Sequence, residues 1–572
     1  MKKLRWILYP VMIAAAVWLM SRSQRTNDEI SYASVLTVSV SAGDVRQEIR
    51  PWMPDEDSMV FFIPSFVESE RAVFRLHTAS KVTLDGTPLK SGMSVGGLDP
   101  DAEHSLEISG HKPVAFRLVT SSGVATAFIE TASGNMDAVH ADKRYKEAGR
   151  ITLYTKDGRL EYRSAGRDKI RGRGQWTWKQ EKKSYNLYLD RPSDLLGMGS
   201  SDRWALISNT LDETNLRNWL AYRFAEQISP YEGFSQKCEF ADVYLNGQYN
   251  GLYLLCERVG IGQNRLEIPP DSYLFSLDAA DRIDDMDTAF LINGGTAVEI
   301  RNPEPCTAEA ADCLKTHLLS MQNALLCGEE ESGSGKHWSE YIDMDSWARK
   351  YLVEEILMNY DAGAQSQYFF LEPGSDTVFA GPCWDYDDIL GVFGRGMTPN
   401  CFLARREWKS KTEYTPWFGA LWKKDAFSDY VKELYARECR PALQSFLQER
   451  IAGQAEAIRT AALSDRLRWP VQNRVYASYE EALEQMLGFL GRRIGFLDSA
   501  WIDGQEYCTI TLKTARKQYR FFCVPPGEIC RDLPTPESFG IKGKTHWQRE
   551  DTGEDFPYDT PVFEDTDLFA AQ

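Results

Sequence analysis

The chain of 572 residues is short of basic residues and has no closely spaced cysteine pair. It contains 65 Lys and Arg against 83 Asp and Glu, and this net charge of -18 argues against nucleic acid or an anionic membrane surface as the main partner. None of its 11 cysteines belongs to a Cys-x-x-Cys pair, which argues against a zinc site. Cys306 and Cys313 form the most plausible local disulfide. Hydrophobic residues make up 43% of the chain, so global disorder is excluded.

Only one long apolar run occurs, and it lies at the N-terminus. Lys2, Lys3 and Arg5 precede an apolar stretch from Trp6 to Met20, which a polar segment follows. This order is typical of a secretory signal or a short signal-anchor, which we assign to residues 1–27. The flanking positive charges predict that the N-terminus stays inside while the bulk of the chain is exported. We therefore expect an extracytoplasmic protein, secreted or membrane-anchored by its N-terminus.

The remaining sequence divides into three parts. Residues 28–125 contain short β-type runs separated by turn residues, which predict a small all-β sandwich-like domain. Residues 126–505 begin with strands and Gly-rich turns and become mostly helical, so the predicted class is α+β. Residues 506–572 read as a β-like strip and an acidic tail that contains prolines. We expect this tail to be disordered or only loosely attached.

Several elements can be placed within residues 126–505. Apolar spacing predicts helices over 211–228, 310–328, 343–361 and 480–501, and Asp343 or Asp345 is the expected N-cap of the third. Alternating residues around 185–189 predict a strand, and strands over 366–372 and 376–381 are expected to form a hairpin. An Asn-Gly pair at 246–247 predicts a tight turn between two further strands.

The stretch "AGPCWDYDDILG", residues 380–391, places three carboxylates beside aromatic rings. In one interpretation Asp388 caps a helix that begins at Ile389, and Asp385 and Asp387 face water. In the other, a cation holds the acidic side chains, because hard divalent ions are ligated by carboxylate oxygens.

A second acidic residue is expected close to this stretch. Asp361 ends a predicted helix and Asp385 follows a strand two strands later, so the hairpin between them can bring both loops to one edge. One carboxylate could then accept a proton while the other holds a metal. Upstream, the Gly-rich turn "RGRG" at 171–174 and Lys183 add backbone N–H groups and positive charge. Taken singly, these residues are also compatible with a solvated turn, a surface lysine and a loop cap.

Five blocks in this order resemble the spore coat protein H (CotH) family of kinase-like proteins. They are "IRGRGQWTWKQEKKSYNLYLDRPSDLLGM", "LRNWLAYRFAEQI", "FADVYLNGQYNGLYLLCERVGIGQNRL", "NYDAGAQSQYFFL" and "GPCWDYDDILG", and they span roughly residues 126–500. The resemblance implies an atypical bilobal protein-kinase-like fold that binds ATP with Mg²⁺ or Mn²⁺ and phosphorylates a protein acceptor on a surface or spore coat. The sequence lacks the usual short motifs of protein kinases.

The resemblance also implies roles for individual residues. It makes Asp361 the catalytic aspartate and Asp385 the metal aspartate, with Asp387 either assisting as a second ligand or holding the loop. The implied nucleotide-binding residues are Lys183, Arg173 and, near the hinge between lobes, Glu257.

The chain departs from the family pattern at two places. Gln175-Trp176 replaces the usual Asn-Ser, and Ser366 stands where the family often has an asparagine that serves a second metal. Serine is a poorer ligand, so either one metal is lost or Gln365 holds it.

Two other functions are compatible with the same residues. A degenerate kinase fold could serve as a non-catalytic surface or coat protein. Alternatively, Asp361 and Asp385 could be the acid and base of a glycoside hydrolase. ATP binding distinguishes the hydrolase from the other two, and metal-dependent phosphotransfer distinguishes the kinase from the coat protein.

Overall fold

The computed structural model describes residues 32–571 except 43–44, 68–71, 79, 281–282, 284–288, 293–295, 329–334, 393–397, 406–414, 471–474, 514–518, 539–540 and 542. These residues form six sheets combined with helices, which confirms the predicted α+β class. The expected signal or anchor segment, residues 1–27, lies outside the described part. No helix within the described part is long and apolar enough to cross a membrane.

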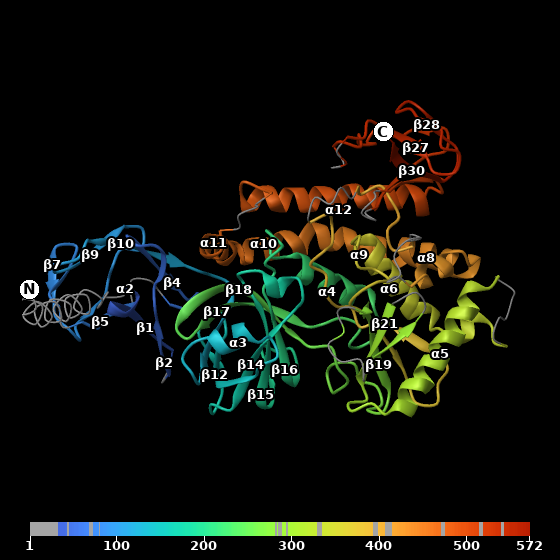
Figure 1. Ribbon diagram of the computed structural model, residues 1–572. Helices are drawn as coiled ribbons and strands as arrows, with labels where there is room; N and C mark the ends of the chain where they lie inside the picture. The colour runs from blue at the N-terminus through green and yellow to red at the C-terminus, as the bar shows by residue number, and fades with distance from the viewer. Residues whose placement is uncertain are drawn as a thin grey trace, which may run out of the picture.

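The β-type runs near the N-terminus form two sheets, on the left in Figure 1. The first has the order β2-β1-β5-β8, with β1 Leu36–Ala42, β2 Val45–Ile49, β5 Val73–Leu76 and β8 Ser94–Val95; the short helix α2 (Tyr32–Val35) precedes it. The second has the order β3-β4-β10-β9-β6-β7, with β3 Trp52–Asp55, β4 Ser58–Ile63, β6 Val82–Leu84, β7 Thr87–Leu89, β9 His104–Ile108 and β10 Val114–Thr120. Both sheets contribute to one apolar cluster that contains Val38, Phe61 and Phe116.

The next part of the chain forms a large sheet with the order β11-β17-β18-β16-β15-β14-β12-β13. Its strands are β11 Ala125–Thr131, β12 Glu147–Tyr154, β13 Leu160–Arg163, β14 Asp168–Arg173, β15 Ser184–Asp194, β16 Ser200–Ile207, β17 Cys238–Leu245 and β18 Gln248–Glu257. One face packs with the region of α3 (Asp137–Ala141) and the other with α4 (Arg217–Ile228). The predicted tight turn joins β17 to β18, and Asn246 and Gly247 both have the positive φ that such a turn requires.

The "RGRG" stretch is not the Gly-rich turn that the sequence predicts. Arg171, Gly172 and Arg173 belong to β14 and pair in register with residues of β15. The turn begins only at Gly174, whose φ is +88°. A side chain at Gly172 would collide with the ring of Trp178, since a Cβ there would lie 2.4 Å from it. Gly172 therefore makes room for a tryptophan of the following loop, not for a ligand.

A second sheet and most of the helices follow, in green to orange in Figure 1. The sheet has the order β20-β21-β19-β22-β23, with β19 Tyr273–Ala279, β20 Ala289–Ile292, β21 Thr296–Asn302, β22 Gln367–Leu371 and β23 Val378–Ala380. The helices are α5 Ala308–Leu326, α6 Met344–Ile356, α7 Trp417–Trp422, α8 Asp425–Leu434, α9 Arg440–Ser445, α10 Ala452–Ala457, α11 Arg459–Arg468 and α12 Tyr479–Trp501. Asp343 is the N-cap of α6, because its side chain accepts a hydrogen bond from Ser346 N.

The C-terminal segment is not the disordered or loosely attached tail that its composition suggests. It forms a sheet with the order β25-β24-β30-β27-β28, built from β24 Cys508–Lys513, β25 Tyr519–Val524, β27 His546–Arg549, β28 Asp555–Phe556 and β30 Thr566–Ala571. A small pair, β26 Glu528–Ile529 and β29 Pro561–Val562, accompanies it. Ile510, Phe522, Trp547 and Leu568 give this sheet its own core, which the acidic composition of the tail conceals.

All 11 cysteines are free thiols, so the expected Cys306–Cys313 disulfide does not form. Helix α5 begins between the two residues, after its N-cap Thr307. The helix therefore separates Cys313, which is on its exposed side, from Cys306 in the preceding loop.

Candidate active site

The loop after α6 and the loop after β23 meet at one edge of the second sheet. Strands β22 and β23 form an antiparallel hairpin in which Phe369 faces Ala380. The hydroxyl of Ser366 donates a hydrogen bond to Oδ2 of Asp385 at 2.8 Å. Because Ser366 belongs to the loop that Asp361 opens, the predicted proximity of the two loops is confirmed.

Four carboxylates crowd together in these loops. Burial and then the nearby charges of Asp385, Asp388 and Asp361 raise the pKa of Asp387 well above its usual range, while Arg173 opposes the shift. Like charges held this close favour either a retained proton or a cation. The alternative in which Asp388 caps a helix at Ile389 does not hold in the described residues, because no helix begins at 389 and 390–392 form a turn.

The donor set suits a hard divalent ion. Asp385 and Asp387 offer carboxylate oxygens, and the amide of Gln365 lies in the facing loop, where its backbone N–H donates to the carbonyl of Asp361 at 3.1 Å. Oxygen ligands of this kind are those that Mg²⁺ and Mn²⁺ prefer. The part of the chain that the structure describes contains no group of three or more His, Cys, Asp or Glu arranged to hold a metal. The side chains of the described residues therefore do not complete a metal site by themselves.

Helix α4 holds the acidic loop, here defined as residues 384–389, from one side. The backbone N–H of Tyr386 donates to Oδ1 of Asn218 at 2.8 Å, and that of Asp385 donates to the hydroxyl of Tyr222 at 3.3 Å. Arg217 donates from Nε to the carbonyl of Ile389 at 3.1 Å. Its charge is balanced by Asp212, and both side chains are almost fully buried.

Helix α6 holds the same loop from the other side. The hydroxyl of Tyr386 donates to Oε1 of Glu354 at 2.7 Å, and Lys350 lies 2.7 Å from the same oxygen. The other carboxylate oxygen of Glu354 accepts a bond from Asn359 at 2.6 Å, and Oδ1 of Asn359 accepts from the backbone N–H of Asp361 at 3.0 Å. One buried network therefore positions both Asp361 and the acidic loop.

Arg173 lies beside the acidic loop, and Arg171 and Arg258 are close to Arg173. The guanidinium of Arg173 lies over the ring of Trp384, 4.8 Å from its centre, at the start of the acidic loop. Arg171 and Arg258 both lie within 6 Å of the ring centre of Tyr188, at 5.8 and 5.7 Å. Within the described residues, none of these three arginines has a carboxylate at ion-pair distance, and Nε of Arg171 is buried without a hydrogen-bond partner. Such a cluster is complementary to an anion.

Two of the predicted nucleotide-binding residues lie apart from this cluster. Ser184 pairs with Arg173, so these two side chains lie on the same face of the sheet. Lys183 directly precedes Ser184, and its side chain therefore points to the opposite face. Its ammonium donates to the carbonyls of Trp178 and Gln180, each at 2.9 Å. Glu257 ends β18 and is 2% exposed; burial raises its pKa to about 7, and Lys237 N donates to its carboxylate at 3.3 Å.

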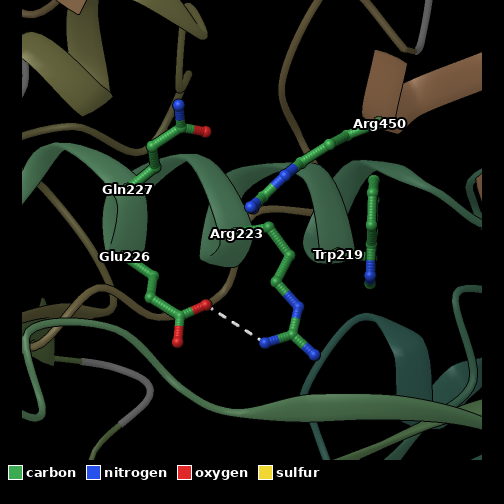
Figure 2. Close-up of a pocket in the computed structure, with 5 residues that line it drawn as sticks. All are labelled: Trp219, Arg223, Glu226, Gln227 and Arg450. Carbon is green, nitrogen blue, oxygen red and sulfur yellow. Dashed lines mark hydrogen bonds and ion pairs between the residues drawn. The ribbon is translucent and has the colours of Figure 1, made fainter. Parts of the chain in front are cut away.

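A separate cavity of about 500 Å³ lies along a different face of α4, as Figure 2 shows. Trp219, Arg223, Glu226, Gln227 and Arg450 line it, and Arg223 forms an ion pair with Glu226 at 3.1 Å. None of these residues contributes to the network around the acidic loop.

Sequence reasoning missed the residues of α4 that hold the acidic loop. Asn218 and Tyr222 are four residues apart and thus share one face of the helix, where they are buried. Polar side chains at helical spacing on a buried face usually have specific hydrogen-bond partners, so the spacing of Asn218 and Tyr222 in the sequence indicates such a role. Their partner, the backbone of the acidic loop, could not be identified without the fold.

A family model described as CotH kinase protein matches residues 170–497, which is more than half of the chain. The chain therefore belongs to the CotH family, as the five sequence blocks indicate, and is a kinase-like protein. The match begins in β14 and ends in α12, so it contains both loops of the site. No curated protein matches the chain.

Proposed function

We propose that the protein is an exported atypical protein kinase that transfers a phosphoryl group from ATP to a protein acceptor with Mg²⁺ or Mn²⁺. The single observation that carries the proposal is the juxtaposition of the acidic loop with Arg173, whose guanidinium is 4.8 Å from the ring of Trp384. A metal nucleotide needs both kinds of group at once, carboxylates for the cation and basic groups for the phosphates.

The proposal places the nucleotide between two lobes. The sheet formed by β11–β18 would be one lobe, and the second sheet with helices α5–α12 the other, preceded by a separate β-domain over residues 28–125. Glu257 would border the connection between the lobes, because β18 ends there and the chain passes on to β19.

Each loop residue receives a role from its surroundings. Bound metal–ATP would supply the phosphoryl group, and its metal ion would balance the negative charge of the phosphates. Asp385 and Asp387, with Gln365, would hold the metal. Asp361 would accept the proton of the acceptor hydroxyl. Its backbone N–H is bonded to Asn359 at 3.0 Å, which fixes the loop that carries it.

Arg171 and Arg173 would contact the phosphates. Their side chains lie on the same face of β14, because the two residues alternate along the strand and pair with Asn186 and Ser184 of β15. On this face Arg173 lies over Trp384 of the acidic loop. Lys183 could join them only by leaving the two carbonyls that it binds, so the arginines are the main phosphate contacts in this proposal.

Export rests on the sequence of residues 1–27 alone. The charged-apolar-polar order there predicts that the native protein fractionates with membranes or with the exterior of the cell. Recovery of the full-length chain from the cytoplasm in soluble form would contradict this part of the proposal.

One observation favours a second candidate, a non-catalytic surface or coat protein. The hydroxyl of Ser366 is engaged with Asp385 at 2.8 Å, so it is not free to serve a second metal as an asparagine would. The full-length protein incubated with labelled ATP, Mn²⁺ or Mg²⁺ and a generic acceptor such as casein separates the two. Incorporation that Asp361→Ala removes supports the kinase. ATP binding without incorporation under either metal supports the second candidate.

A further inference from the structure

A buried ion pair connects α11 to the loop that precedes β15. Nζ of Lys182 lies 2.6 Å from Oδ1 of Asp465, and the lysine side chain is 1% exposed. The backbone of Leu252 in β18 completes the arrangement. Its carbonyl accepts from Lys182 at 2.6 Å, and its N–H donates to Oδ1 of Asp465 at 2.9 Å. Both charged side chains thus have hydrogen-bond partners, in a site where the lysine is buried and the aspartate side chain is 12% exposed.

A glycine in β18 provides the space that the ion pair occupies. Gly251 has a φ of +107°, and a Cβ there would lie 2.2 Å from Oδ1 of Asp465 and 3.0 Å from Cε of Lys182. Further along, Nε1 of Trp469 donates to the carbonyl of Asn250 at 2.9 Å. The end of α11 therefore holds two neighbouring parts of β18, and in Figure 1 α11 lies beside that strand.

The pair is close in sequence and register to the candidate active site. Lys182 is the last residue but one of the loop 174–183, and Ser184, two positions later, pairs with Arg173. Arg173 is the residue that lies over Trp384 of the acidic loop. Fixing Lys182 therefore fixes one end of the loop 174–183, whose other end directly follows Arg173.

We infer that Asp465 is a positioning residue: through Lys182 it sets the loop 174–183, and with it Arg173, relative to the acidic loop. The inference rests on the proposed function, since its consequence is an orientation of the proposed phosphate contacts. An apolar pair of similar volume would stabilise the fold as well as or better than the buried charges. What an ion pair with a closed set of hydrogen bonds adds is a single orientation.

Residues that precede the family match contact the same helix. The guanidinium of Arg468 in α11 lies 5.2 Å from the ring centre of Trp52, and the hydroxyls of Ser122 and Thr460 are 2.7 Å apart. The N-terminal sheets therefore contribute to the position of Asp465, and the test uses the full chain.

The test measures hydrogen exchange in the peptide covering 174–183, together with KM and kcat for MnATP. Asp465→Asn is expected to increase exchange in this peptide about 10-fold, because local opening no longer breaks the ion pair. It should also raise KM for MnATP about 10-fold with kcat within about 2-fold of wild type, since a displaced phosphate contact affects binding first. Arg459→Gln is the control, because Arg459, also in α11, forms an exposed ion pair with Glu480 of α12.

A second variant separates positioning from loss of stability. Lys182→Met/Asp465→Leu replaces both charges with apolar groups and is expected to fold while keeping the increased exchange in 174–183. Wild-type exchange in this double variant would overturn the inference. So would an equal increase in a peptide covering 147–154, which forms β12 of the same sheet. If wild type does not bind MnATP, the proposed function fails, and the exchange measurements still decide whether Asp465 positions the loop.

Discussion

Ser366 and Asp385 face each other across the candidate active site, each with a positive φ, 54° and 67°, and are joined by one hydrogen bond of 2.8 Å. Non-glycine residues in this region of φ carry a cost of about 1–3 kcal/mol each and persist only where their surroundings hold them. The hydrogen bond between the two side chains is part of what holds them. It also occupies one of the two carboxylate oxygens of Asp385, Oδ2.

The first prediction follows from this bond. Ser366→Ala should weaken Mn²⁺-dependent ATP binding about 10-fold, because Asp385 loses the donor that orients it. Isothermal titration calorimetry of MnATP measures the change. Ser375→Ala, in the turn of the β22–β23 hairpin, is the matched control and should bind as wild type. Unchanged affinity of Ser366→Ala would show that the bond does not orient the metal ligand.

Asp361 should behave differently from the metal ligands. Asp361→Ala is expected to retain MnATP binding and to lose phosphotransfer by about 10² or more, the scale typical of a positioned acid–base group. Nucleotide affinity by calorimetry and incorporation of labelled phosphate are measured on the same preparation. If this variant loses ATP binding altogether, Asp361 is not a base that contacts only the acceptor.

The role of Arg173 can be tested with a matched arginine on the neighbouring strand. Arg173→Gln should lower the affinity for MnATP about 10-fold or more, since one charge-assisted contact to an anion contributes roughly 1.5–3 kcal/mol. Arg191→Gln changes the net charge equally at an exposed position of β15 and should leave affinity unchanged. Equal losses in both variants would point to long-range electrostatics instead of a direct phosphate contact.

Asp242 of β17 makes the free energy of unfolding depend on pH. Burial raises the pKa of this carboxyl from 3.8 to about 7, although Tyr249 donates a hydrogen bond to it at 2.9 Å. Between these values the folded protein keeps a proton that the unfolded chain releases, so stability falls as pH rises from about 4 to about 7.

Asp242→Asn removes this ionisable carboxyl and its contribution to the pH dependence of stability. The stability of the variant relative to wild type should therefore increase by about 1 kcal/mol or more between pH 4.5 and pH 7.5, since each unit of pKa shift corresponds to about 1.4 kcal/mol. Urea unfolding at the two pH values gives the difference. Asp503→Asn, at an exposed position, is the control. A difference that does not change with pH would mean that Asp242 is ionised in the folded protein.

Local patterns predicted the elements of the fold well where a signal is confined to neighbouring residues. The Asn246-Gly247 turn and the Asp343 N-cap are examples, because a positive φ and an N-cap hydrogen bond both act over a few residues. The same reasoning failed for Gly172, whose small size serves Trp178 and not a turn. It also failed for the C-terminal sheet, because strands distant in sequence pair there, such as β24 with β30.

The candidate site was predictable in part for the same reason. Asp361 and Asp385 are separated by one hairpin, so their proximity follows from two predicted strands and a turn. Lys183 was expected to contribute to the site, but strand alternation directs it to the other face, while Lys182 is engaged with Asp465. A one-residue choice between adjacent lysines depends on strand register, which composition does not determine.

Metal-dependent nucleotide binding at the acidic loop is the central claim, and calorimetry on wild type and Asp385→Asn tests it most directly. The substitution keeps the size of the side chain and removes one negative charge from the crowded loop, so the fold should be retained. We predict that wild type binds ATP only when Mn²⁺ or Mg²⁺ is present, and that Asp385→Asn loses this binding while unfolding at a temperature close to that of wild type. Metal-independent ATP binding, or equal affinity in the folded variant, would contradict the account.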